Sequence, residues 1–136
     1  GEAQALQIEA GDPVCAYHWL SLADGQPIAV FESLFSILRL PGITAALTET
    51  SSVTRALSIA GIDDYTRAST RLTAVRATAT HALLLNVGEG DPLLRSSSVN
   101  TCAIGKPVEY GRTWFAGDWV TLTLEDQKVI EKSLPE

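Results

Sequence analysis

Residues 51–76 read SSVTRALSIAGIDDYTRASTRLTAVR, and this stretch predicts a short helix followed by a long strand. Ser52 suits the N-cap of the helix, and Gly61 is expected to end it in the left-handed conformation. Residues 65–76 then alternate, which predicts a strand with Arg67 and Arg71 on one polar face. Four apolar residues have the i, i+3, i+4, i+7 spacing of a single helical face: Val53, Ala56, Leu57 and Ala60.

Arg55 is the unusual residue of this helix because it occupies the third helical position, where a capping box would place Glu or Gln. A cation there opposes the helix dipole by about 0.3–1 kcal/mol. A bound anion would reverse that effect, with the hydroxyls of Ser52 and Thr54 and the free backbone N–H groups as further donors. Arg55 therefore either points into solvent or pairs with a local acid, or it belongs to an anion site.

The charge distribution favours a small anionic ligand over a nucleic acid. The 136 residues carry a net charge of −6, so the surface as a whole repels a polyanion. Against that background residues 51–76 hold two acids and four arginines: Arg55, Arg67, Arg71 and Arg76. A solvated basic strand face would give the same pattern, so the ligand remains one of two interpretations.

The composition predicts a single soluble domain. A hydrophobic content of 46% over 136 residues is enough for one core, and the apolar runs are too short for a membrane span or a signal peptide. We therefore expect a cytoplasmic domain without membrane contact. The chain starts GEAQA and contains no methionine, so we expect an excised domain whose N-terminal partner is missing.

The cysteines and histidines indicate no metal and no cofactor. Cys15 and Cys102 have no second Cys or His at ligand spacing. They are expected to be free buried thiols, with a disulfide or a reactive thiol as the alternatives. His18 and His81 are isolated and form no metal motif.

Two hairpins are expected to flank the central segment. Residues 13–22 and the strand that begins at Pro27 are joined by an Asp-Gly turn. The strand at 13–22 is apolar on both faces, so we expect it to lie in the centre of the sheet. Glu32 follows core-type residues on its own face, so it is either paired, reaching for a ligand, or at a solvated strand end. The other expected elements are a weakly helical segment (34–40), helices (43–47 and 78–87, the latter with Ala79, Ala82, Leu83 and Asn86 on one side), strands (92–101, 107–115 and an edge strand, 119–124), a linker (1–11) and a helix or tail (125–136).

Four motifs in this order resemble the UTRA domain, the effector-binding half of HutC-type members of the GntR family of bacterial transcription regulators. They are LADGQPIAVFES, SSVTRALSIAGI, GEGDPLL after an Ala- and Leu-rich helix, and IGKPVEYGRTWFAGD. The resemblance covers residues 11–125. The wording DYTRASTRLTA with PVEYGRTWFAGD is most similar to the branch that regulates phosphonate metabolism, the PhnF type.

This resemblance implies an α+β fold in which helices flank an antiparallel sheet, the chorismate-lyase-like fold. It places the domain at residues 12–125 and a tail at 126–136. It also implies a homodimer, and a DNA-binding winged helix-turn-helix domain that is absent from this chain. The implied ligand is a small metabolite that bears a phosphonate or phosphate. In the family the anionic group is held near a serine that matches Ser52, and acids that match Glu32 and Glu109 help to line the pocket.

One departure from the family affects the expected site. Many members carry arginines on the first strand just before the Asp-Gly turn, where this chain has Trp19 and Ser21. The anion must then be met from elsewhere. The expected ligand-binding residues are Ser52, Thr54, Arg55, Arg71, Glu32, Glu109, Tyr110 and Arg112.

Three functions follow from these observations. The first is the sensor domain of a repressor. A ligand that binds one of the domain's two conformational states better than the other shifts the equilibrium between them and so changes DNA binding. The second is an enzyme, since the implied fold also hosts a lyase, but no Ser/His/acid order, metal spacing or paired carboxylates favour catalysis. The third is a dimerisation module with a degenerate pocket, which the loss of the first-strand arginines keeps open.

Overall fold

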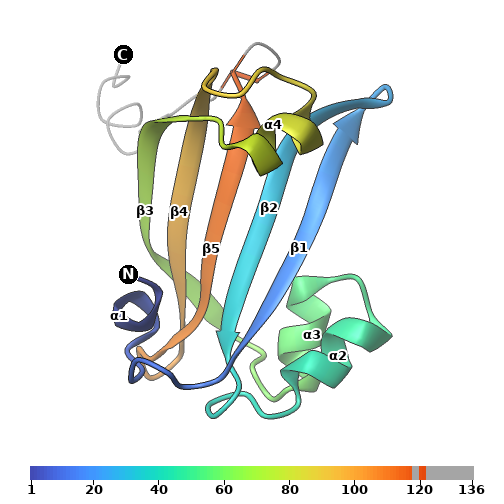
Figure 1. Cartoon of the computed structure of the whole chain (residues 1–136). Helices are drawn as coiled ribbons and strands as arrows, with labels where there is room; N and C mark the ends of the chain where they lie inside the picture. The colour runs from blue at the N-terminus through green and yellow to red at the C-terminus, as the bar shows by residue number, and fades with distance from the viewer. Residues whose placement is uncertain (118–119, 122–136) are drawn as a thin grey trace, which may run out of the picture.

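The computed structural model describes residues 1–117 and 120–121 and has one five-stranded antiparallel sheet at its centre (Figure 1). The strands are β1 (Val14–Ala23), β2 (Gln26–Ser36), β3 (Tyr65–Arg76), β4 (Pro92–Cys102) and β5 (Pro107–Ala116). They lie in the order β1-β2-β5-β4-β3, so the two hairpins pair through β2 and β5. The predicted α+β class is confirmed. The expectation that the first strand is central was wrong, because β1 lies at an edge of the sheet.

The β1–β2 hairpin turns at the predicted Asp-Gly pair. Asp24 has φ 51° and Gly25 has φ 79°, two successive left-handed residues. This is the conformation of a type I′ turn, whose twist matches that of the flanking strands and which Asp-Gly adopts readily. The turn, together with a one-residue register shift between Ser21 and Leu22, sets the pairing in which Glu32 lies opposite His18.

Two helices, α2 (Ile43–Glu49) and α3 (Val53–Ile59), cover one face of the sheet, which we call the α2/α3 face. Figure 1 shows them side by side at the end of the sheet where β2 terminates. Phe35 and Val108 from the strands pack with the buried helix residues in one core cluster: Ile43, Ala46, Leu47, Ala56 and Leu57. Both cysteines are free, as expected, but they are half-buried at the margin of this cluster and not fully buried.

The predicted start and end of α3 are confirmed. The backbone N–H of Arg55 donates to Ser52 Oγ at 3.2 Å, so Ser52 is the N-cap. Gly61 has φ 101°, and the N–H of Ile62 donates to the carbonyl of Leu57 at 2.7 Å. A left-handed glycine with this bond is a Schellman end, and Ile62 packs on the core beyond it.

The opposite face, which we call the α1/α4 face, carries α1 (Glu2–Leu6) and α4 (Ala79–Leu85). Residues 1–11 were expected to be a linker, but they contain α1, and Leu6 is fully buried. α4 begins after the cap Thr78, within the predicted helix 78–87. Its buried residues are Ala82 and Leu85, whereas Leu83, expected on the apolar side, is 85% exposed.

Two features differ from the sequence expectations because pairing between strands overrides local pattern. Residues 34–40 were expected to be weakly helical, yet β2 continues to Ser36 because its last residues pair with the start of β1. The register of β3 shifts between Arg67 and Ser69. This bulge reverses the alternation of β3, so Arg67 lies on the α2/α3 face and Arg71 on the α1/α4 face.

The expected edge strand 119–124 and the expected helix or tail 125–136 fall outside the described residues, apart from residues 120–121. Within the described part of the chain, no helix is both long enough and apolar enough to cross a membrane. The same residues contain no group of three or more His, Cys, Asp or Glu side chains arranged to hold a metal ion.

Candidate functional site

A cavity of about 270 Å³ lies on the α2/α3 face between the sheet and the beginning of α3. Its volume is near the lower end of the range for small-molecule sites, so it suits a ligand of few atoms. The side chains that point to this face and line it are those of Trp19, Phe31, Ser33, Val53, Tyr65, Arg67, Ser98, Asn100, Glu109 and Thr113. Glu32, Gly111 and Arg112 also line it, although the side chains of Glu32 and Arg112 point to the opposite face.

The floor of this cavity holds a buried and oriented carboxylate. Glu109 is 7% exposed; the hydroxyl of Ser33 donates to its Oε2 at 2.6 Å, and the amide Nδ2 of Asn100 donates to its Oε1 at 2.8 Å. Each carboxylate oxygen has a further lone pair. Gly111 lies beside the carboxylate, where a Cβ would be in ordinary van der Waals contact with Glu109 Oε2 at 3.8 Å. The remaining lone pairs allow Glu109 to accept a hydrogen bond from a ligand.

An aromatic wall and the arginine of β3 complete the cavity. The rings of Trp19 and Phe31 stack with their centroids 4.8 Å apart, and the ring of Tyr17 lies 5.1 Å from that of Trp19. Trp19 stands at one of the two positions where the sequence resemblance implies an arginine. Arg67 supplies a cation from β3. Strict alternation along the strand predicts Arg67 on the same face as Arg71, so Arg67 was not predicted as a residue of this site. No pattern in the sequence indicates the bulge that places Arg67 on the α2/α3 face.

None of the three predicted site residues at the start of α3, Ser52, Thr54 and Arg55, is among the residues that line this cavity. Ser52 Oγ accepts from the Arg55 N–H, and Thr54 Oγ1 lies 2.8 Å from the hydroxyl of Tyr65, so both hydroxyls are already bonded within the protein. Val53, between them, lines the cavity. Arg55 is exposed on α3 and is not among the lining residues.

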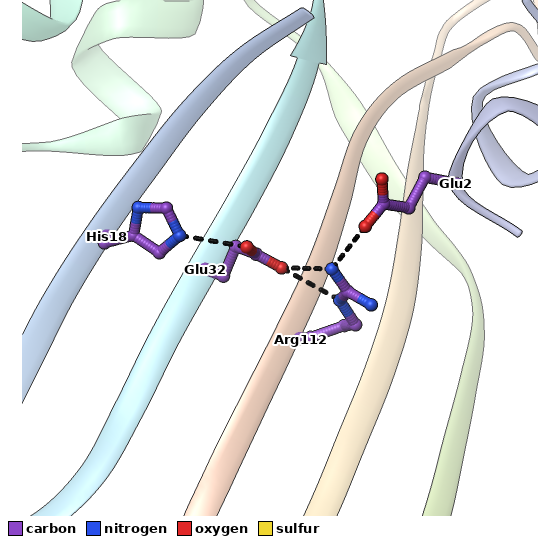
Figure 2. Close-up of polar contacts among 4 residues, drawn as sticks. All are labelled: Glu2, His18, Glu32 and Arg112. Carbon is purple, nitrogen blue, oxygen red and sulfur yellow. Dashed lines mark hydrogen bonds and ion pairs between the residues drawn. The ribbon is translucent and has the colours of Figure 1, made fainter. Parts of the chain in front are cut away.

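The other four predicted site residues, Glu32, Arg71, Tyr110 and Arg112, lie on the α1/α4 face, since side chains alternate along each strand. Figure 2 shows that two of them form an ionic network across β1, β2, β5 and α1. Glu32 Oε1 accepts from Arg112 Nε at 2.9 Å, and Glu32 Oε2 lies 2.9 Å from His18 Nε2. Arg112 Nη2 donates to Glu2 at 2.6 Å. Glu32 is thus paired, as one of the interpretations of the sequence expected.

The network holds both central groups in their charged forms. Burial raises the pKa of Glu32, but hydrogen bonds to His18 and Arg112 outweigh it, so the pKa lies below the ordinary value of 4.5. Burial lowers the pKa of Arg112, but the bonds to Glu32 and Glu2 outweigh it and raise the pKa overall. The charged groups of the network pair with and hydrogen-bond to one another, and the bond between Arg112 and Glu2 holds α1 against the sheet. This structural role explains why Glu32 and Arg112 are present without a ligand.

The network predicts a loss of stability in acid. Because the folded-state pKa of Glu32 is below its unfolded value, its contribution is present above pH 4.5 and is lost as the pH falls through the folded-state pKa. We expect the urea midpoint of the wild type to fall more steeply below pH 4.5 than that of Glu32→Gln. Parallel pH dependences for the two proteins would contradict this assignment.

Comparisons with known proteins identify the family: residues 1–121 match the UTRA domain, and the chain belongs to this family. It is 36% identical over 123 residues to the HTH-type transcriptional regulator RB1450 of Rhizobium meliloti. That match covers 90% of this chain and 50% of the relative, so the chain spans about half of the relative's length.

Solved structures agree with this assignment. The C-terminal domain of YurK from Bacillus subtilis superposes with a TM-score of 0.81 at 21% identity, over 90% of this chain and 84% of that one. The C-terminal domain of PhnF superposes with a TM-score of 0.79 at 26% identity, over 91% and 78% of the two chains. The similarity to YurK shows a shared fold. It is the fold that the resemblance in the four sequence motifs implies.

Proposed function

We propose that this domain is the effector sensor of a GntR-family, HutC-type transcription regulator, and that it binds a small aminoalkylphosphonate or a related phosphorylated amine on the α2/α3 face. The effector would control DNA binding by a winged helix-turn-helix outside this chain, in a cytoplasmic homodimeric repressor. Similarity to a helix-turn-helix regulator and to PhnF supports the class of protein. It also supports a regulatory rather than an enzymatic role.

The observation that carries the ligand class is the combination of Glu109 and Arg67 in one cavity. Glu109 is held by two donors and retains acceptor capacity, so it suits the amine or hydroxyl of a ligand. Arg67 offers a planar pair of donors to phosphonate oxygens. The stacked rings of Trp19 and Phe31 provide an apolar wall for an alkyl chain or a cation–π contact for the amine.

The start of α3 contributes to the same proposal. Val53 lines the cavity, and the neighbouring hydroxyls of Ser52 and Thr54 can each form one hydrogen bond beyond those within the protein. A ligand between β3 and α3 would connect the sheet to the helix pair, and it would shift the domain only to the extent that it binds one arrangement better than another. In the proposed site Arg55 does not bind the ligand.

We expect Arg67→Gln to weaken aminoethylphosphonate binding by about tenfold or more, because a charged hydrogen-bonding pair contributes about 1.5–3 kcal/mol. Isothermal titration calorimetry on this chain gives the dissociation constant. Arg55→Gln is the matched control, since it removes an exposed arginine close in the fold but outside the cavity.

If Arg55→Gln weakens binding and Arg67→Gln does not, the anion is held at the exposed start of α3, and the cavity assignment is wrong. Absence of binding across alkyl- and aminoalkylphosphonates would favour the second candidate function, a dimerisation module with a degenerate pocket. The observation that favours this candidate is that Trp19 and Ser21 stand where the family resemblance implies arginines.

A further inference from the structure

A second cavity lies on the α1/α4 face, where β3, β4 and β5 meet α1. Its volume is about 580 Å³, and the sheet separates it from the cavity that contains Glu109. The residues that line it are Gly1, Gln4, Ala5, Ser69, Arg71, Thr73, Arg95, Ser97, Ser98, Val99 and Tyr110. No Asp or Glu is among these residues.

Two arginines from adjacent strands share this cavity. In the β3–β4 register Arg71 lies opposite Ser97 and Thr73 lies opposite Arg95, so the two arginines are diagonal neighbours on one face. Diagonal residues in an antiparallel pair are about 7–8 Å apart at the backbone, which long side chains easily span. Both guanidinium groups can therefore reach one small ligand.

Arg95 carries a donor that the described residues leave without a partner. Its Nε is buried, and within residues 1–117 and 120–121 it has no hydrogen-bond partner. A buried donor without an acceptor is costly, and two like charges on the same sheet face repel each other. An anion between the two guanidinium groups would remove both penalties.

Hydroxyl groups around the arginines strengthen the case for an oxyanion. Ser69, Thr73 and Ser97 line the cavity on the same two strands, and Tyr110 lines it from β5. Hydroxyls and guanidinium groups together are suited to the several oxygens of one phosphate-like or carboxylate group. The cavity thus combines positive charge with donors and has no described carboxylate to compete.

We propose that this cavity is a second anion-binding site, separate from the effector cavity, that takes a small oxyanion of two or more charges between Arg71 and Arg95. Gln4 and Ala5 of α1 form part of its wall, and Glu2 of the same helix is held to the sheet by Arg112. Binding is therefore linked to the docking of α1.

The test uses this chain with Arg67→Gln, so that the effector cavity is weakened while the second site is intact. Inorganic phosphate and a dicarboxylate, succinate, are titrated separately by calorimetry, which distinguishes phosphate-type from carboxylate ligands. We expect one of them to bind, and Arg71→Gln to weaken that binding by about tenfold or more. Arg76→Gln, an exposed arginine of β3 outside the cavity, should leave it unchanged.

Arg95→Lys is the second variant, because it keeps the charge and removes the buried Nε. It should weaken binding while leaving the thermal midpoint within a few degrees of the parent, and the Nε–H resonance of Arg95 should shift on titration of the parent. Absence of binding by both anions overturns the proposal. So does binding that Arg71→Gln and Arg95→Lys leave unchanged, and these outcomes do not depend on the effector cavity.

Discussion

Replacing Phe35 with alanine is expected to lower the free energy of unfolding by about 3–5 kcal/mol, the range for removing a large aromatic side chain from a core. Phe35 is fully buried on β2 and belongs to the cluster that joins the sheet to α2 and α3. Truncation would leave a cavity between these layers. Urea denaturation monitored by circular dichroism measures the change.

Leu83→Ala is the matched control, because Leu83 is an apolar residue with 85% exposure. Its effect should lie within about 0.5 kcal/mol of zero. A loss below about 1 kcal/mol for Phe35→Ala would mean that the helix pair is not packed on β2 as described.

Glu109→Gln is expected to remove the preference for ligands with an amine. We expect the ratio of affinities for aminoethylphosphonate and ethylphosphonate to fall by about tenfold or more, because a hydrogen bond to a charged group contributes about 1.5–3 kcal/mol. The amide is nearly the same size, so the cavity retains its shape. Calorimetry with both ligands on both proteins measures the ratio.

Glu2→Gln is the control for this substitution, since it neutralises an acid of the ionic network on the opposite face of the sheet that does not line the cavity. It should leave the affinity ratio unchanged. If Glu109→Gln keeps the wild-type preference while Glu2→Gln removes it, the amine is recognised on the α1/α4 face. The effector site would then have to be placed in the ionic network, contrary to the proposal.

Local sequence signals predicted the elements whose structure depends on neighbouring residues. The Ser52 cap, the Gly61 end and the Asp-Gly turn each require only a few residues, and all are confirmed. Strand β3 was predicted at its observed bounds, Tyr65–Arg76, because its alternation is long. The order of strands is a long-range property, and the apolar residues on both faces of β1 did not reveal that it lies at an edge.

The candidate site was harder to predict because it depends on which face each strand turns inward. A single bulge near residue 68 moves Arg67 to the α2/α3 face, and sequence alternation cannot show it. Glu109 and Glu32 were grouped as pocket acids, yet the strand register places them on opposite faces. Glu32 pairs with Arg112, whereas the described residues that donate to Glu109, Ser33 and Asn100, are neutral.

The measurement that tests the central proposal most directly is a heteronuclear NMR titration of this chain with aminoethylphosphonate. We predict that the largest amide shifts fall on Val53, Arg67, Asn100, Glu109 and Gly111, residues around the cavity on the α2/α3 face. Shifts confined to Arg71, Arg95 and α1, which line the cavity on the opposite face, or no shifts at saturating ligand, would contradict it.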